Sequence, residues 1–230
     1  MNNYSQLEEK LGLKFEDCEL LDRAFVHKSY VNEHRGEDIR HNERLEFLGD
    51  AVLELIATRH LFEHYPNQEE GEMTAYRSAL VKGQNLAKVA EELELGQYLK
   101  LSKGEEKSGG REKSYILANT VEAVIGAIYL SLGYQAAEKM IEEFIMKELD
   151  DIIENGLHID SKTKFQEICQ EKEDITPHYD LIEAEGPDHE KIFTMGAYIG
   201  EELISQGTGS SKQKAEDAAA AEALRIKGWE

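Results

Sequence analysis

The chain has 230 residues, of which 40% are hydrophobic, and it carries a formal net charge of −21. This length can bury one large core or two smaller ones, and we expect two domains. The acidic balance argues against non-specific binding to nucleic acids, because Lys and Arg supply most of that affinity.

The sequence lacks the features of a secreted or membrane-inserted protein. No basic start precedes an apolar run, and no segment has eighteen uncharged apolar residues in succession. Cys18 and Cys169 are far apart and lie in no motif typical of a disulfide framework or a zinc site. We therefore expect a cytoplasmic protein with no membrane contact and with reduced thiols.

From residue 4 to about residue 150, apolar residues recur at three- and four-residue spacing, which predicts helices. The expected helices are Ser5–Leu11, Cys18–Phe25, Asn42–Tyr65, Met73–Leu93, Ile116–Leu132 and Ala136–Ile153. The segment 101–114 is rich in glycine, serine and charge, and is expected to be a mobile loop. These elements predict an all-α domain over residues 1–153.

Residues 154–161 have the composition of a domain linker. Asn155-Gly156 would end one helix, and Asp160 or Ser161 would cap the next. The pattern then predicts a helix at Lys162–Gln170, strands at His178–Glu185, Ile192–Ile199 and Glu202–Gly207, and an alanine-rich helix after residue 210. Residues 159–230 are therefore expected to form a small α+β domain of order α-β-β-β-α.

The stretch HNERLEFLGD (41–50) opens a helix whose acids share one side. At about 100° per residue, one stripe of this helix contains Glu43, Glu46, Asp50 and Glu54, and the opposite side contains Leu45, Leu48, Val52, Leu55 and Ile56. A solvated acidic face is the simplest interpretation. Phe47 lies within the acidic stripe, however, where a solvated surface gains nothing from an aromatic ring. We therefore expect Phe47 to contact a partner surface.

The stretch ILANTVEAVIGAIYL (116–130) is apolar on nearly all sides and is expected to be buried, although it contains Glu122. An unpaired buried carboxylate costs roughly several kcal/mol or takes up a proton. Glu122 could pair with Arg44 or Arg77. Alternatively, a hard cation such as Mg²⁺ could gather carboxylate and amide oxygens from Glu46, Asp50, Asn119 and Glu122. The spacing permits either arrangement.

HNERLEFLGDAVLEL resembles the signature of the ribonuclease III family, and ILANTVEAVIGAIYL looks like its second acidic motif. The tail is similar to a double-stranded-RNA-binding domain, so the resemblance covers nearly the whole chain. It implies an endoribonuclease that cleaves duplex RNA with Mg²⁺, for which Mn²⁺ can substitute. The products would carry 5′-phosphate and 3′-hydroxyl ends with two-nucleotide 3′ overhangs. The resemblance also implies a homodimer with Phe47 at its contact, and a role in rRNA and mRNA processing.

Transferred residue by residue, the resemblance makes Asp50 and Glu122 catalytic and adds Glu46 and Asn119 as further metal ligands. Asn119 stands where the family usually has Asp. This departure predicts weaker metal binding, although an amide oxygen can still ligate a cation. Glu72 matches a further acid of the family, whose role we do not assign; a lone exposed Glu is usually only solvated.

Residues 159–230 contain eight Lys and Arg against sixteen Asp and Glu, so duplex RNA would have to be bound by a local set of contacts. Each candidate alone is more often a solvated residue or a simple turn, and their occurrence together and in order favours RNA binding. The candidates for minor-groove contacts are Thr163, Gln166 and Gln170, with His189 in the GPDH turn; those for phosphates are Ser211, Lys212 and Lys214 at a helix start.

Two alternatives to an active nuclease stay open. The first is a non-cleaving protein that binds double-stranded RNA on the same fold and is impaired by Asn119. The second is a ribosome-associated structural homologue, which would not need to keep Glu46, Asp50 and Glu122 together.

Overall fold

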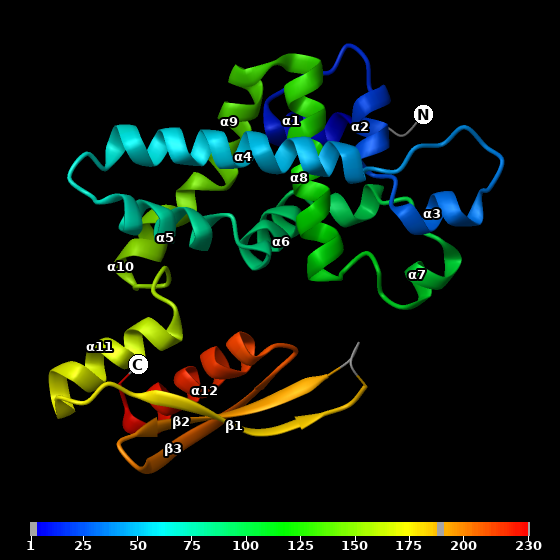
Figure 1. Ribbon diagram of the computed structural model, residues 1–230. Helices are drawn as coiled ribbons and strands as arrows, with labels where there is room; N and C mark the ends of the chain where they lie inside the picture. The colour runs from blue at the N-terminus through cyan, green and yellow to red at the C-terminus, as the bar shows by residue number, and fades with distance from the viewer. Residues whose placement is uncertain (1–3, 188–190, 230) are drawn as a thin grey trace. The chain divides into compact units, whose positions relative to one another are not determined.

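The computed structural model describes residues 4–187 and 191–229. The chain divides into two compact units, Met1–His158 and Ile159–Glu230. Figure 1 shows that the first unit is built from helices and that the second combines helices with a sheet. The predicted fold class, an all-α domain followed by a small α+β domain, is confirmed.

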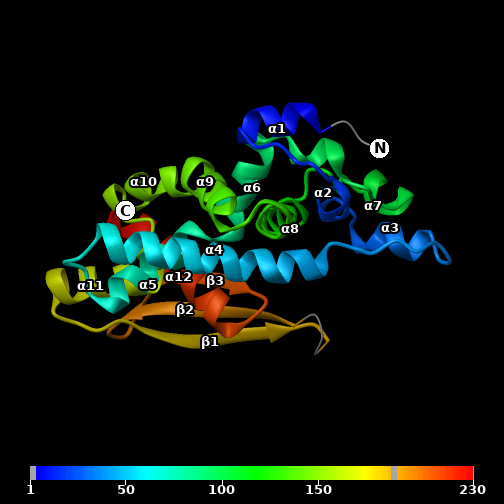
Figure 2. The same ribbon diagram turned by 90° about the horizontal axis from the view of Figure 1, so that it is seen from above.

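The first unit is built around one buried helix. In chain order its helices are α1 (Ser5–Leu11), α2 (Glu19–Ala24), α3 (Lys28–Glu33), α4 (Glu43–His64), α5 (Glu70–Leu80), α6 (Gly83–Glu92), α7 (Lys103–Lys107), α8 (Ser114–Leu132), α9 (Tyr134–Phe144) and α10 (Leu149–Glu154), with the 3₁₀ turns η1 (Leu95–Tyr98) and η2 (Met146–Glu148). In Figure 2, α8 is seen nearly along its axis, with α4 crossing beside it. By length and composition alone α8 could cross a membrane, but most of it is buried among α2, α4, α6 and α9, as expected of a core helix.

Two of the predicted helices are wrong as single elements, and two short helices, α3 and α7, were not predicted. The expected helix at 73–93 is divided into α5 and α6, because the backbone of Lys82 is extended, with ψ of 136°. The Asn85 side chain spans this break by donating to the Ala79 carbonyl at 2.8 Å. The expected helix at 136–153 is likewise divided into α9, η2 and α10.

The segment 101–114 is not the irregular loop that its composition suggested, because it contains α7. Ser102 caps this helix by accepting a hydrogen bond from the backbone N–H of Glu105 at 3.1 Å. The Arg111 guanidinium donates to the carbonyls of Gly96 and Leu99 at 2.8 and 2.9 Å. Long-range contacts of this kind leave no trace in local composition, which explains the wrong prediction.

The second unit follows the predicted order: α11 (Ser161–Glu173), β1 (His178–Glu185), β2 (Ile192–Ile199), β3 (Glu202–Gly209) and α12 (Lys212–Lys227). The strands form one antiparallel sheet of order β1-β2-β3. Asp160 caps α11 as expected, with its carboxylate accepting the Thr163 N–H at 3.0 Å. The structure extends β3 two residues beyond the predicted end at Gly207.

The alanine run of α12 lets this helix lie directly on the sheet. A Cβ at Gly207 of β3 would lie 2.1 Å from the backbone nitrogen of Ala219, so no side chain fits between the two backbones there. The Ser205 hydroxyl donates to the Ala219 carbonyl at 2.6 Å. The four fully buried alanines of α12 are Ala215, Ala219, Ala220 and Ala223.

Candidate active site

The candidate site lies where α4 and α8 cross at backbone distance. A Cβ at Gly49 of α4 would lie 1.7 Å from the carbonyl oxygen of Glu122 on α8, and one at Gly126 would lie 2.3 Å from the carbonyl oxygen of Leu45. Any larger residue at either position would push the helices apart. The two glycines therefore bring the acidic side of α4 beside Glu122.

Glu122 is half-buried rather than fully buried as the sequence suggested. Burial raises its pKa to about 7, and the nearby charges of Asp50 and Glu46 act in the same direction. Of the two alternatives that the sequence left open for Glu122, the structure does not show the pairing with Arg44 or Arg77. Arg77 pairs with Glu54 at 2.8 Å, and over residues 4–187 and 191–229 no basic side chain forms an ion pair with Glu122.

Glu46 lies in the same electrostatic environment. Burial raises its pKa, the charges of Glu43 and Asp50 add to this effect, and a hydrogen bond from Asn119 opposes it. Asn119 lies one turn before Glu122 on α8, so its amide faces the same acids. Asp50 is exposed to solvent. The structure thus brings together all four of the residues predicted as metal ligands.

The donor set at this crossing fits a hard cation. Burial is the main cause of the raised pKa of Glu122, and the charges of Asp50 and Glu46 add to it, so a cation bound here would offset both effects. Within the described part of the chain, no group of three or more His, Cys, Asp or Glu side chains is arranged so that it could by itself hold a metal ion. An open arrangement of oxygens suits Mg²⁺, which is held by few carboxylates and keeps several waters.

A small pocket beside Glu46 and Asn119 contains residues that the sequence analysis did not predict. Its other lining residues are His27, Lys28, Asn42, Glu43, Tyr115 and Ile116. Lys28 pairs with Glu43 at 3.0 Å. His27 precedes α3, which the apolar periodicity did not reveal. The signal that could have revealed it is the HKS tripeptide, because a polar residue before a helix commonly caps it.

A second apolar face of α4 is exposed to solvent. Phe47 is 79% exposed, Leu55 59% and Phe62 71%, and a step of about 100° per residue places all three within one side of the helix. We call Phe47, Leu55 and Phe62 the α4 stripe. The prediction that Leu55 faces the core is wrong, because α4 carries apolar residues on two sides and only the side with Leu45 faces α8.

The predicted minor-groove residues of α11 share one exposed face. Thr163, Gln166 and Gln170 are all exposed at spacings of three and four residues. The Thr163 hydroxyl donates to Asp160 at 2.8 Å, and the Gln170 amide donates to Asp174 at 2.7 Å. These local bonds would have to be exchanged for contacts to a ligand. His189, the other predicted minor-groove residue, lies outside the described residues.

The predicted phosphate-contacting residues lie at the start of α12. Ser211 caps the helix, with its hydroxyl accepting the Lys214 N–H at 3.3 Å. Lys212 and Lys214 are exposed, and among the residues placed by the structure neither forms an ion pair. Two other lysines of this unit are neutralised, since Lys162 pairs with Glu216 and Lys227 with Glu173. Glu72, the further acid of uncertain role, is exposed on α5.

Comparison with known proteins relates both units to described families. Residues 17–149 match the family described as Ribonuclease-III-like, and residues 161–227 match the double-stranded RNA binding motif. Ribonuclease 3 of Listeria welshimeri is 43% identical over 220 residues, covering 96% of each chain, and Ribonuclease 3 of Enterococcus faecalis is 45% identical over 221 residues with the same coverage.

A solved nuclease domain is also similar. The nuclease domain of ribonuclease III from Campylobacter jejuni, in a structure that describes flexibility in its dimer-forming region, superimposes with a TM-score of 0.58. It is 41% identical and covers 63% of this chain and 97% of its own. With both domains matched, and with relatives aligned over nearly the full length, the chain belongs to the ribonuclease III family.

Proposed function

We propose that this ribonuclease III-type endoribonuclease hydrolyses double-stranded RNA with the help of a divalent cation, Mg²⁺ in the first instance. The observation that supports this most directly is the convergence of acids at the crossing of α4 and α8, with Glu122 held there at a pKa of about 7 and without a base. A structural role alone would give this half-buried carboxylate a basic partner.

Four side chains would hold the cation: Glu46, Asp50, Asn119 and Glu122. When bound there, Mg²⁺ lowers the pKa of a coordinated water and offsets negative charge on a phosphate. Asn119 contributes an amide oxygen and no charge, and its amide lowers the pKa of Glu46, which burial raises. The protein's own contribution is to fix these oxygens on two helices whose backbones are in close contact at Gly49 and Gly126.

Asp50 is the side chain best placed to position the attacking water, because it is the exposed member of the acidic group. The water oxygen forms a new bond to phosphorus as the bond to the 3′ oxygen breaks. One water proton passes to Asp50, and the departing 3′ oxygen takes up a proton from solvent water. This course yields the 5′-phosphate and 3′-hydroxyl ends expected from the resemblance.

The second unit would bind the duplex by its shape. The polar face of α11 would contact 2′-hydroxyls in a minor groove, and the start of α12 would contact phosphates across the adjoining major groove. Few lysines are available for this purpose, since Lys212 and Lys214 are the ones that the structure leaves unpaired at the capped helix start. Binding should therefore show a shallow dependence on salt.

The α4 stripe supports a homodimer. Leu55 lies near the middle of the stripe, with Phe47 and Phe62 at its two ends, so a twofold axis near Leu55 would place each Phe47 opposite the Phe62 end of the partner. A large aromatic that is 79% exposed on a core-forming helix gains stability only when it is covered. Cytoplasmic location and substrates among rRNA and mRNA precursors stay predictions.

The decisive experiment incubates the protein with a long RNA duplex and Mg²⁺, with Glu122→Gln as the matched control. Short duplexes with 5′-phosphate and 3′-hydroxyl ends, absent from the control, are the expected result. Duplex that is bound but never shortened would instead identify the non-cleaving binding protein. In that case Asn119 would be the first residue to revert to Asp.

A further inference from the structure

His27 is held in a single tautomer by the start of α3. Its Nδ1 accepts a hydrogen bond from the backbone N–H of Ser29 at 3.2 Å and lies 2.8 Å from the Ser29 hydroxyl. That hydroxyl oxygen accepts the Ser102 N–H at 3.1 Å, so its own hydrogen is directed to Nδ1. Because a backbone N–H can only donate, Nδ1 must be unprotonated, and the ring proton resides on Nε2.

The ring of His27 lies beside the candidate active site. It lines the small pocket together with Glu46 and Asn119. Burial lowers the pKa of His27, although the charges of Glu105 and Glu43 oppose this effect. Within residues 4–187 and 191–229, Nε2 has no hydrogen-bond partner. The chain thus presents a neutral N–H donor next to the acids that would hold the cation.

We propose that His27 contacts the substrate, with its Nε2–H donating a hydrogen bond to a non-bridging oxygen of an RNA phosphate at the cleavage site. The inference rests on the proposed function. A neutral donor suits this position, because a second positive charge would repel the cation held by Glu46 and its neighbours. Such a bond strengthens as charge develops on the phosphate, so its loss should slow cleavage roughly 100- to 1,000-fold.

Two variants separate this role from simple helix capping. His27→Asn places a carbonyl oxygen where Nδ1 lies, which retains the cap but removes the distal donor. His27→Gln places an amide N–H near the position of Nε2 but removes the cap. We expect His27→Asn to keep the melting temperature of the original protein and to lose single-turnover rate, and His27→Gln to melt lower while cleaving faster than His27→Asn.

The single-turnover cleavage rates are measured with full-length protein, saturating duplex and Mg²⁺. The melting temperatures are measured without RNA. If His27→Asn does not fold, His27→Ser replaces it, because serine is also a good cap. His27 would be shown only to cap α3 by either of two results. The first is a His27→Asn rate equal to that of the original protein, and the second is a His27→Gln rate no higher than that of His27→Asn. Absence of cleavage by the original protein would defeat the proposed function itself.

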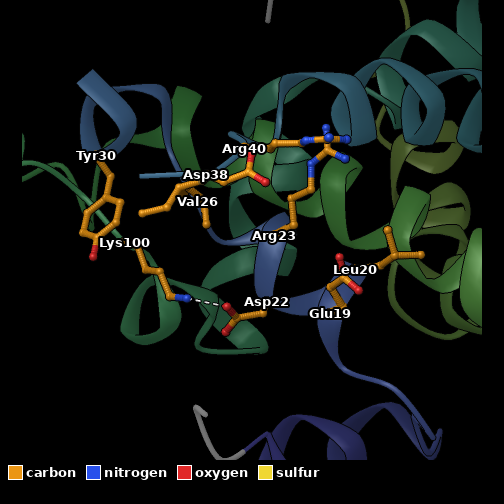
Figure 3. Close-up of a pocket in the computed structure, with 10 residues that line it drawn as sticks. Glu19, Leu20, Asp22, Arg23, Val26, Tyr30, Asp38, Arg40 and Lys100 are labelled. Atoms are coloured by element: carbon orange, nitrogen blue, oxygen red, sulfur yellow. Dashed lines mark hydrogen bonds and ion pairs between the residues drawn. The ribbon is translucent and has the colours of Figure 1, made fainter. Parts of the chain in front are cut away.

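A second, independent observation concerns unpaired arginines beside α2. Figure 3 shows the guanidinium groups of Arg23 and Arg40 adjacent to one another in a pocket of about 410 Å³ that is also lined by Tyr30, Val26 and Lys100. Burial lowers the pKa of Arg23, and the positive charges of Arg40 and Arg44 lower it further. Arg44 therefore also lies near Arg23. The Arg23 Nε–H donates to the carbonyl of His41 at 3.2 Å, which fixes the side chain.

This cluster is unusual for so acidic a chain. Among the described residues, Arg23, Arg40 and Arg44 form no ion pair, although Glu19 and Asp38 also line the pocket. Lys100 is neutralised by Asp22, as the dashed line in Figure 3 marks. Three other arginines of the helical unit are paired: Arg59 with Glu63 and Glu138, Arg77 with Glu54, and Arg111 with Glu106. Three like charges left together indicate an anionic ligand.

We infer that Arg23, Arg40 and Arg44 bind backbone phosphates of the RNA duplex on the nuclease unit, independently of sequence. This inference also rests on the proposed function. Phosphate is the anion that the proposed substrate supplies, and guanidinium groups match its geometry. The contact would add affinity to a chain whose second unit has few free lysines.

The test compares Arg40→Gln/Arg44→Gln with Lys82→Gln/Lys88→Gln, which removes two exposed lysines of the α5–α6 region that are likewise unpaired among the residues described. Duplex binding by the full-length chain is titrated against salt without divalent cation. We expect the arginine variant to lower the salt slope by about two and the lysine variant to leave it unchanged. Equal slopes for the two variants would overturn the inference.

A small phosphate ligand is distinguished in a separate arm. If inorganic phosphate raises the melting temperature of the original protein but not that of the arginine variant, while the salt slopes for RNA are equal, the cluster binds a small anion and the duplex assignment is wrong. An original protein that binds no duplex at all would contradict the proposed function instead.

Discussion

The backbone of Gly49 on α4 lies against the backbone of Glu122 on α8, so closely that a methyl group at position 49 would be 1.7 Å from the Glu122 carbonyl oxygen. Gly49, whose lack of a side chain permits this contact, lies between Glu46 and Asp50 in the sequence. Its size sets the distance from both acids to Glu122, which links the packing of the core to the geometry of the site.

Gly49→Ala should consequently harm both stability and activity. Because the clash is with backbone, which cannot rotate away, we expect a loss of about 3 kcal/mol or more and a melting temperature lower by roughly 6 °C or more. Gly71→Ala is the control, since nothing lies within 4 Å of a Cβ at that helical position. It should be neutral or slightly stabilising. Equal melting temperatures for the two variants would contradict the close crossing of α4 and α8.

Asn119→Asp should increase the affinity of the site for its cation. The substitution restores a negative charge and removes the amide that now donates to Glu46, so Mg²⁺ should bind more tightly. We expect a large gain in cleavage at low Mg²⁺ and a small gain at saturation, and we expect Mn²⁺ to rescue part of the activity of the unmodified chain. The measurement is the cleavage rate against metal concentration. An unchanged midpoint in Mg²⁺ would mean that residue 119 is not a metal ligand.

Glu122→Gln should change the pH dependence of stability when metal is removed by a chelator. The folded-state pKa of Glu122 is raised to about 7 from 4.5, so its favourable contribution is present below pH 4.5 and is lost as pH rises through 7. Glutamine cannot ionise. As pH rises from 4.5 to 7, we therefore expect the free energy of unfolding of Glu122→Gln to increase relative to that of the original protein, by at most about 3 kcal/mol.

The same variant separates catalysis from binding. Glu122→Gln should abolish cleavage in either Mg²⁺ or Mn²⁺ while leaving duplex binding largely intact, because the substitution changes none of the side chains proposed to contact the RNA. Urea unfolding at several pH values measures the expected difference in stability. A gel-shift measurement with duplex RNA tests whether binding is retained. A difference in stability that does not vary with pH would show that Glu122 is not held at a raised pKa.

Phe47→Ala should weaken the proposed dimer. A phenylalanine that becomes fully buried at an interface is worth roughly 3 to 5 kcal/mol, so sedimentation at micromolar concentration should show a shift toward monomer. Leu157→Ala removes another exposed apolar side chain, outside the α4 stripe, and should leave the distribution unchanged. If both variants sediment like the original chain, the stripe is not the dimer contact.

Lys212→Ala together with Lys214→Ala should weaken binding to all duplexes alike. Each lysine neutralises one phosphate in the proposed complex, so the salt slope should fall by about two. Binding to several duplexes of unrelated sequence at three or more salt concentrations provides the measurement. A loss confined to particular sequences would show that these lysines contact bases.

Local sequence patterns predicted the elements that are regular along their length. The predicted bounds of α1, β1 and β2 agree with the structure residue for residue. In each case the apolar period and the residues that end a helix or strand indicate the same bounds. The break at Lys82 was missed because the apolar period continues from α5 into α6, although Gly83, a poor helix former, directly follows the break. Leu55 was placed in the core because periodicity cannot tell a face that packs within the chain from one left for a partner.

The acids of the site were predicted from the sequence, but their environment was not. Glu46, Asp50, Asn119 and Glu122 follow from two motifs, whereas the depth of Glu122 and its lack of a base depend on how α4 meets α8. His27 was missed for a different reason. The proposed role of His27 depends on the hydrogen bond that its Nδ1 accepts from Ser29, which leaves the proton on Nε2. A pattern of residue types does not specify a histidine tautomer.

The three occupied sides of α4 have a consequence for how this protein can vary. One side of the helix, with Gly49 and Leu45, is in contact with α8; the next carries Glu46 and Asp50; and the α4 stripe occupies a third. Little of the circumference is left where a substitution would be without effect. Natural or laboratory variation should therefore accumulate on α5 and α10 and spare nearly every turn in the first half of α4, although much of that half is exposed in a single chain.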